Sequence, residues 1–121
     1  MKEAQSTKWH HFYAFLGGYG KFAALKTYNR DLKTLLAIGG WNEGSRRFSP
    51  LVADPSRRRT FIKSAIRFLR QYNFDGLDLD WEYPSFRDGG KPEDRRNYAK
   101  FVAVSLENIY NLVLIIIKFC T

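Results

Sequence analysis

The sequence predicts an α/β protein with a parallel sheet. Apolar segments of strand length alternate with segments of helical periodicity along the 121 residues, and this alternation is typical of parallel α/β architecture. Residues 33–38 are expected to form a strand buried on both faces, as strands of parallel sheets usually are. A composition of 45% hydrophobic and 26% charged residues, without an internal repeat, indicates a globular unit.

The first half of the chain is expected to hold two strands and two helices. Asp54 is of a residue type that caps helices, and proline, here Pro55, is favoured at the first helical position, so a long helix is predicted to begin there. In order, we predict a strand at 9–15, a loop at 17–20, a short helix at 21–28, a strand at 33–38 and, after a loop, a helix from 55 to about 72.

The second half is expected to add an acidic strand, a last helix and an apolar tail. Residues 73–76 turn into the strand, which is predicted to end near Tyr83, and a loop at 87–90 leads to the helix after Pro92. The apolar run 112–117 is shorter than the ~20 residues that cross a bilayer, and it can form a buried strand. The core stripe expected on the last helix is Tyr98, Phe101, Val102, Leu106 and Ile109.

The acidic strand carries the strongest functional signal. Asp78, Asp80 and Glu82 are two residues apart, so on a strand they share one face, while Leu77, Leu79 and Trp81 take the other. Gathering three carboxylates in this way is expected to raise the pKa of at least one of them, which suits a general acid. A solvated acidic edge strand is the alternative, but a Trp and a Tyr-Pro pair directly beside the last carboxylate argue against it.

Residues 75–84 match every fixed position of DGxDxDWEYP, and the chain thereby resembles the family-18 glycoside hydrolases, the chitinases. Residues 35–42 resemble the second landmark of that family, a strand ending in Gly-Gly-Trp. The resemblance covers about 12–102, and parts of it look like the animal, particularly the arthropod, branch. The family fold is a (β/α)₈ barrel of roughly 250 residues. We therefore expect residues 1–121 to be a partial catalytic domain, about strands two to four of the barrel, with 103–121 as an atypical tail.

The resemblance implies a retaining mechanism in which the substrate supplies the nucleophile. Glu82 would protonate the glycosidic oxygen between N-acetylglucosamine units of chitin or chitooligosaccharides, and then activate water. Asp80 would orient the acetamido group and stabilise the oxazolinium ion, Asp78 would share a proton with Asp80, and Asp75 would have a structural or electrostatic role. Non-proline cis peptides are implied at 14–15 and 82–83. The residues expected to contact or lie beside the sugar are Phe15, Gly39, Gly40, Trp41, Asn42 and Tyr83.

Two of these points allow alternatives. Gly39 and Gly40 can serve a plain strand-ending turn, although beside Trp41 we favour close approach of the backbone to sugar. The family also contains catalytically silent chitin-binding lectins, which typically lack the acid that Glu82 provides here. The later strands of the family barrel supply a tyrosine and a tryptophan to the sugar site, so the 121-residue chain is expected to be inactive and to associate through open strand edges.

The charge and the remaining residues do not add another function. The formal net charge is +8, and we assign the basic residues of the long helix to its solvated outer face rather than to nucleic acid. Adjacent His10 and His11 would point to opposite faces of a strand, so no metal site is predicted, and the family mechanism needs no metal or cofactor. Cys120 cannot form an internal disulfide. No membrane span and no signal peptide are predicted on this chain, while the resemblance implies an extracellular location. The basic residues in question are Arg57, Arg58, Arg59, Lys63, Arg67 and Arg70.

Overall fold

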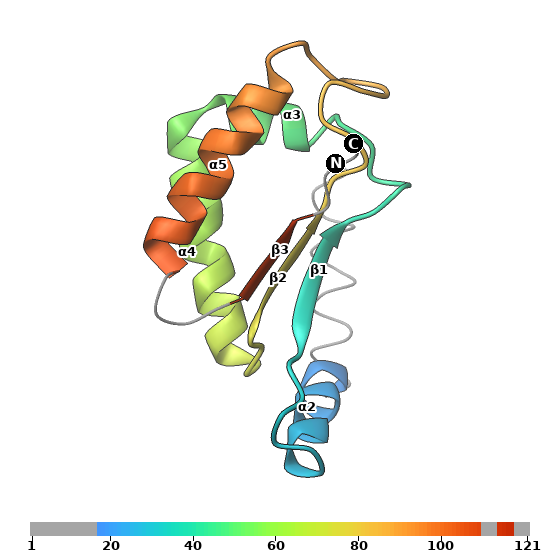
Figure 1. Cartoon of the computed structure of the whole chain (residues 1–121), viewed down its shortest axis with the longest axis vertical. Helices are drawn as coiled ribbons and strands as arrows, with labels where there is room; N and C mark the ends of the chain where they lie inside the picture. The colour runs from blue at the N-terminus through green and yellow to red at the C-terminus, as the bar shows by residue number, and fades with distance from the viewer. Residues whose placement is uncertain (1–16, 110–113, 118–121) are drawn as a thin grey trace.

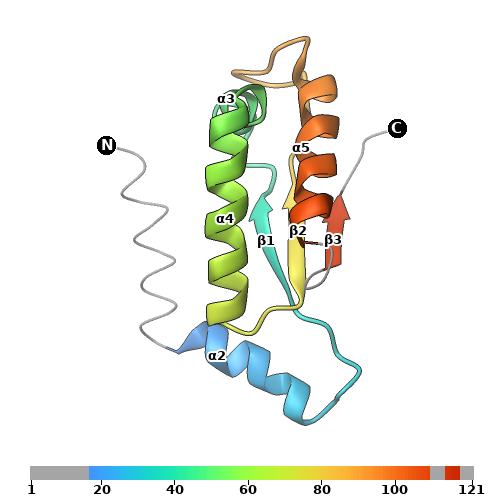
Figure 2. The ribbon, with the colours of Figure 1, turned by 90° about the vertical axis from the view of Figure 1, so that its left-hand side faces the viewer.

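The described part of the chain forms a three-stranded parallel sheet with helices over one face (Figure 1). The structure is a computed structural model that describes residues 17–109 and 114–117. The sheet has the order β1 (Leu35–Gly39), β2 (Gly76–Asp80) and β3 (Leu114–Ile117). Figure 2 shows the long helices α4 (Pro55–Gln71) and α5 (Asp94–Ile109) side by side in front of the strands. The predicted parallel α/β architecture is therefore confirmed.

The strand register brings the ends of β1 and β2 together. Leu35 pairs with Gly76 at one end and Gly39 with Asp80 at the other, so both strands end at the same level. On its other side β2 pairs in parallel with β3, which confirms the strand expected from the apolar run 112–117. The strand expected at 9–15 lies outside the described residues.

The helices before β2 agree with the sequence prediction in part. The long helix α4 is confirmed at both ends, and the carboxylate of Asp54 caps it by accepting the Arg57 backbone N–H at 2.8 Å. The short helix begins earlier than predicted, as α2 (Gly18–Ala23), and continues as the 3₁₀ helix η1 (Ala24–Thr27). Helix α3 (Phe48–Ala53) was expected to be loop. It forms because Phe48, Ser49 and Val52 share one buried face against the rest of the core.

The apolar stripe predicted for the last helix is wrong at one position. Tyr98, Phe101 and Val102 are buried on α5 as expected, but Leu106 is 46% exposed and Ser105 is buried instead. The side chain of Ile109, also predicted in the stripe, lies outside the described residues. Ser105 lies four residues after Phe101 and donates its hydroxyl to the Phe101 carbonyl at 2.7 Å, which satisfies the hydroxyl without an outside partner. A helix face can therefore continue through a serine where apolar periodicity alone favoured the adjacent leucine.

The core lies between the sheet and its helices in two clusters. Burial of a Val, Leu, Ile or Phe side chain in this core contributes roughly 1.5–3 kcal/mol to stability. The cluster toward the carboxyl ends of the strands contains Phe48, Val52, Ile62, Leu79, Trp81, Tyr98, Phe101 and Val102. The cluster toward the amino ends contains Ala65, Leu69, Phe74 and Leu77.

Strand β1 is less buried than predicted. The sequence predicts a strand at 33–38 covered on both faces, whereas in β1 Ala37 and Gly39 are exposed and the other three residues are half-buried. The reason is its place: among the described residues β1 is an edge strand, and the face opposite the helices carries no described layer. The apolar run thus reflects a strand suited to burial in a larger sheet.

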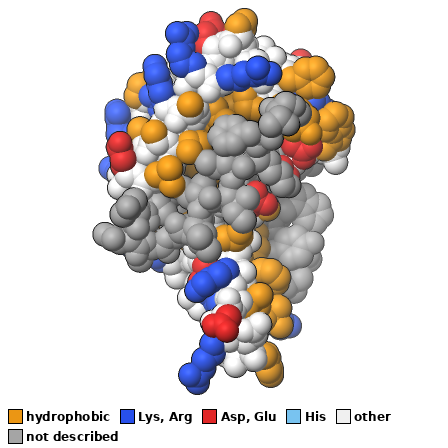
Figure 3. Space-filling model, viewed as in Figure 1, with side chains coloured by type: hydrophobic (Ala, Val, Ile, Leu, Met, Phe, Trp, Pro, Cys, Tyr) orange, Lys and Arg blue, Asp and Glu red, His pale blue; other side chains and the backbone are white. Residues whose placement is uncertain are grey.

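The outer face of the helical layer is basic. As predicted for a solvated helix face, α4 exposes Arg57, Arg59, Lys63, Arg67 and Arg70. Arg58 differs from the prediction, because it is half-buried and donates from Nη1 to the Val52 carbonyl at 2.5 Å. Figure 3 shows Lys and Arg side chains spread along the helical side of the molecule. No helix within residues 17–109 is long and apolar enough to cross a membrane.

Candidate active site

The carboxyl ends of β1 and β2 meet at one edge of the sheet. The backbone N–H of Gly40, just after β1, donates to the carbonyl of Asp80 at 2.7 Å. The acidic strand was predicted to continue to about Tyr83, but β2 ends at Asp80, where its pairing with β1 also ends. Glu82 and Tyr83 therefore follow the strand, at the edge where Gly40 and the next residues follow β1.

The two aspartates of β2 point away from the core, as the alternation predicted. Leu77 is 2% and Leu79 0% exposed on the helical side, while Asp78 and Asp80 are partly exposed on the other. A Cβ built on Gly40 would lie 3.9 Å from Oδ2 of Asp80, so this carboxylate stands beside the turn after β1. Oδ1 of Asp78 is buried, and no described residue donates a hydrogen bond to it. This acceptor lies on the face of the sheet opposite the helices.

Trp81 anchors the backbone between Asp80 and Glu82. Its side chain is fully buried, stacks on Phe48 with ring centroids 5.1 Å apart, and meets Tyr98 edge-on at 5.3 Å. Burial of this indole on the helical side confirms the predicted alternation through position 81. Because its rings are packed on two sides, the flanking carboxylates project from a rigid support.

A buried serine that the sequence did not single out links the two loops. Ser45 is 0% exposed, and its Oγ accepts the indole N–H of Trp81 at 2.9 Å. The same hydroxyl donates to the carbonyl of Phe86 at 2.6 Å, in the loop after β2. Nothing in the sequence distinguishes this serine from an exposed loop serine, because its partners lie about 40 residues away.

The negative charges of Asp78 and Asp80 act on Tyr98 in the core. Its hydroxyl donates to the Leu79 carbonyl at 3.3 Å. Burial raises the pKa of Tyr98 strongly, and the negative charges of Asp78 and then Asp80 raise it further. The Tyr98 hydroxyl is therefore protonated and neutral at physiological pH.

Asp75 lies at the opposite, amino end of β2. Its carboxylate accepts the Thr34 N–H at 2.8 Å and pairs with Lys26 Nζ at 3.0 Å. Burial opposes its ionisation, but the hydrogen bonds from Thr34 and Lys26 and the Lys26 charge outweigh burial, so the pKa of Asp75 is lowered. The contacts tie η1, the residue before β1 and the residue before β2 together.

The expected sugar-contact residues fall into three groups. Trp41 and Asn42 are exposed on the loop after β1, Tyr83 is half-buried, and Phe15 lies outside the described residues. The Glu82–Tyr83 peptide bond is cis, as the resemblance implied, whereas the 14–15 bond is not described. Gly39 has a packing reason of its own, since at φ 107° a Cβ there would meet the Asp80 carbonyl oxygen and the Phe48 ring. Gly40 is the glycine that faces a carboxylate.

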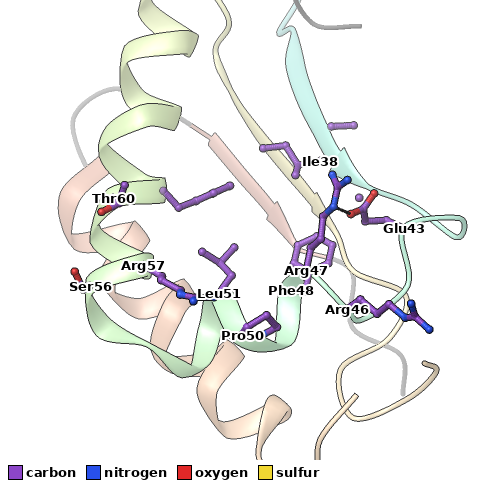
Figure 4. A pocket seen from close by; sticks show the side chains of 13 residues that line it. Ile38, Glu43, Arg46, Arg47, Phe48, Pro50, Leu51, Ser56, Arg57 and Thr60 are labelled. Carbon is purple, nitrogen blue, oxygen red and sulfur yellow. Dashed lines mark ion pairs between the residues drawn. The ribbon is translucent and has the colours of Figure 1, made fainter. Parts of the chain in front are cut away.

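A hollow in the described residues lies away from these carboxylates. Its volume is about 910 Å³, and it lies between β1, α3 and α4 (Figure 4). Glu43 and Arg47 form an ion pair of 3.2 Å at its rim. None of the acidic-strand carboxylates lines it. Among the described residues no group of three His, Cys, Asp or Glu side chains could hold a metal ion.

Comparison with known proteins places the chain in a family. The model for glycosyl hydrolases family 18 matches residues 1–112, and the chain belongs to that family. It is 57% identical over 82 residues to "Probable chitinase 2" of Drosophila melanogaster, a match covering 68% of this chain and 17% of that protein. The Ostrinia furnacalis Group IV chitinase, solved with allosamidin, is similar with a TM-score of 0.84 and 38% identity, over 88% of this chain and 29% of that one.

The chain is also similar to a solved structure that is described as a pseudo-chitinase. Human YKL-39, a pseudo-chitinase with retained chitooligosaccharide binding, matches with a TM-score of 0.74 and 32% identity, over 86% of this chain and 29% of that one. The chain thus spans less than a third of the length of each of these relatives. It holds part of the (β/α)₈ barrel of the family, as the sequence predicted.

Proposed function

We propose that this chain carries the catalytic carboxylates of a chitinase, which hydrolyses β-1,4 bonds between N-acetylglucosamine units with retention of configuration. The observation that carries the proposal is the common placement of Asp78 and Asp80 on the face of β2 opposite the helices. Glu82 follows them at the edge where Gly40 and Trp41 also lie. Barrel enzymes of this architecture build their sites at that edge.

Each carboxylate has a separate role in the proposed reaction. Glu82, half-buried beyond the strand end, protonates the leaving glycosidic oxygen while the acetamido oxygen of the same sugar attacks the anomeric carbon. Asp80 accepts the acetamido N–H and stabilises the oxazolinium cation. Asp78, whose buried Oδ1 lacks a donor among the described residues, shares a proton with Asp80. Glu82 then takes a proton from the water that opens the ring.

The sugar contacts are proposed for the loops around this edge. The indole of Trp41 is 54% exposed and offers an apolar face to a pyranose ring. Gly40, beside Asp80, lets the backbone come close to the substrate, and Tyr83, Asn42 and Phe15 complete the set. Asp75 supports the strand from its far end. We place the action of the protein outside the cell, on chitin or chitooligosaccharides, without a cofactor.

Binding without hydrolysis is the second candidate function. The similarity to YKL-39 favours it, because that fold is compatible with chitooligosaccharide binding alone. The presence of Glu82 together with Asp80 and Asp78 favours the enzyme. The two functions differ in one measurable property, since only the enzyme depends on a proton donor at position 82.

A chimera tests the assignment. Residues 17–102 of this chain replace the matching segment of the Ostrinia furnacalis Group IV chitinase, and hydrolysis and binding of chitooligosaccharides are measured. Glu82→Gln should lower hydrolysis by about 10²-fold or more and leave binding intact. The control, Glu93→Gln, changes an exposed carboxylate and should leave both unchanged. Parental hydrolysis in the Glu82→Gln chimera would exclude Glu82 as the acid, and binding without any hydrolysis in the parental chimera would favour the lectin-like function.

A further inference from the structure

The geometry points to Arg87 as a positioning residue that holds the exposed indole of Trp41 for stacking on a sugar ring. This inference rests on the proposed function and adds to it a residue outside the acidic motif. The guanidinium carbon of Arg87 lies 3.8 Å from the centroid of the Trp41 ring. Nη1 of the same side chain donates to the backbone carbonyl of Trp41 at 2.6 Å. One side chain therefore restrains both the ring and the backbone of Trp41.

Arg87 is itself held against the loop after β1. Its neighbour Asp88 forms an ion pair with Arg46. At Gly89, with φ 84°, a Cβ would come within 2.8 Å of the Arg46 Cα, so only glycine allows this close approach. The carbonyl of Arg87 accepts the Gly90 N–H at 3.0 Å, which closes a turn. The segment 87–90 is thus packed on the loop that carries Trp41.

The two contacts from Arg87 to Trp41, here called the clamp, leave one face of the indole ring for a ligand. Arg87 covers one face of an indole that remains 54% exposed, and apolar side chains gather at the upper right of Figure 3, where the loops after β1 and β2 lie. Sugars bind to tryptophan by placing their C–H groups on the ring face, which needs a ring of fixed orientation. A side chain already held in its binding conformation loses less entropy on binding, and a stacked cation fixes an aromatic ring.

Removing the clamp should weaken sugar binding without unfolding the site. We expect Arg87→Ala to weaken chitooligosaccharide binding by about 3–10-fold, from the loss of a cation–π contact and the freed indole. Arg87→Lys keeps the charge but has neither the planar face nor the fork of donors, so it should fall between the parent and Arg87→Ala. Arg59→Ala, at an exposed position on α4, removes the same charge and should leave binding unchanged.

The position of Trp41 can be measured in the whole chain by ¹⁹F NMR of 5-fluorotryptophan. The chain has three tryptophans, and Trp41→Phe identifies the resonance of interest. Arg87→Ala should move the Trp41 resonance and increase its solvent isotope shift while the Trp81 resonance stays in place; Arg59→Ala should move neither. Three results would each overturn the inference that Arg87 holds Trp41. They are an unchanged Trp41 resonance in Arg87→Ala, an equal movement of the Trp81 resonance, and a parent protein in which both resonances have the shifts of unfolded protein.

The same resonance reports binding when the chain is titrated with the N-acetylglucosamine hexamer. The graded order parent, Arg87→Lys, Arg87→Ala supports the inference. Equal affinities with a displaced Trp41 resonance would overturn the link to sugar binding. If the parent binds no hexamer, this result excludes both a sugar site in this chain and the role of Arg87 in sugar binding. The Trp41 resonances measured without sugar still decide whether Arg87 holds Trp41.

Discussion

Replacing Ser45 by alanine tests how the two loops of the candidate site are held together. The hydroxyl of Ser45 accepts the Trp81 indole N–H at 2.9 Å and donates to the Phe86 carbonyl at 2.6 Å. Both Ser45 and Trp81 are 0% exposed, so water cannot replace the lost partner without opening the core. The substitution changes the volume of the side chain very little, and its effect should come from the hydrogen bonds.

The expected loss is about 2–4 kcal/mol in the free energy of unfolding. Leaving the buried indole N–H without an acceptor costs about 1–3 kcal/mol, and losing the bond to the Phe86 carbonyl adds about 1 kcal/mol. Domains of this size are stable by about 5–15 kcal/mol. Ser45→Ala should therefore remove a large share of the stability and loosen the backbone around Glu82.

Ser105→Ala is the matched control. Ser105 is also buried, at 2% exposure, but its hydroxyl bonds only to the carbonyl one helical turn earlier. Alanine is a better helix former, so this variant should stay within about 1 kcal/mol of the parent. Urea unfolding followed by the fluorescence of the chain measures both. A Ser45→Ala variant no less stable than Ser105→Ala would refute the role assigned to this hydroxyl.

Three further changes give distinct outcomes in urea unfolding. Gly39→Ala should cost about 2–4 kcal/mol through positive φ and contact with the Asp80 carbonyl, whereas Gly20→Ala, which meets no atom within 4 Å, should be neutral or stabilising; equal effects would contradict the packing argument. The lowered pKa of Asp75 means that its contribution is present above about pH 4 and is lost as the pH falls through the folded pKa. Asp75→Asn should therefore flatten the acid limb of stability against pH, and an unchanged limb would contradict this. The raised pKa of Tyr98 means that its contribution is present below about pH 10 and is lost as the pH rises beyond it. Tyr98→Phe should reduce the alkaline loss of stability, and a loss as steep as in the parent would count against the burial of that hydroxyl.

The local pattern of residues predicted much of the fold. Alternation through 77–81 separated core leucines from aspartates because side chains on a strand take opposite faces whatever the partner. Asp54 and Pro55 marked the start of α4 because capping is decided within one turn. The sequence predicts a loop before Asp54, but α3 forms there through burial against distant parts of the chain. Short-range periodicity does not reveal such burial.

The sequence by itself determined the acidic motif, the side of β2 on which Asp78 and Asp80 lie, and the family to which these residues point. Only the tertiary structure decided that β2 ends at Asp80, that Ser45 is buried between two loops, and that Arg87 lies over Trp41. The physical reason is range. Strand alternation and helix caps depend on neighbours a few residues apart, whereas Arg87 and Trp41 are 46 residues apart in the chain and meet only because parallel pairing brings the ends of β1 and β2 to one edge.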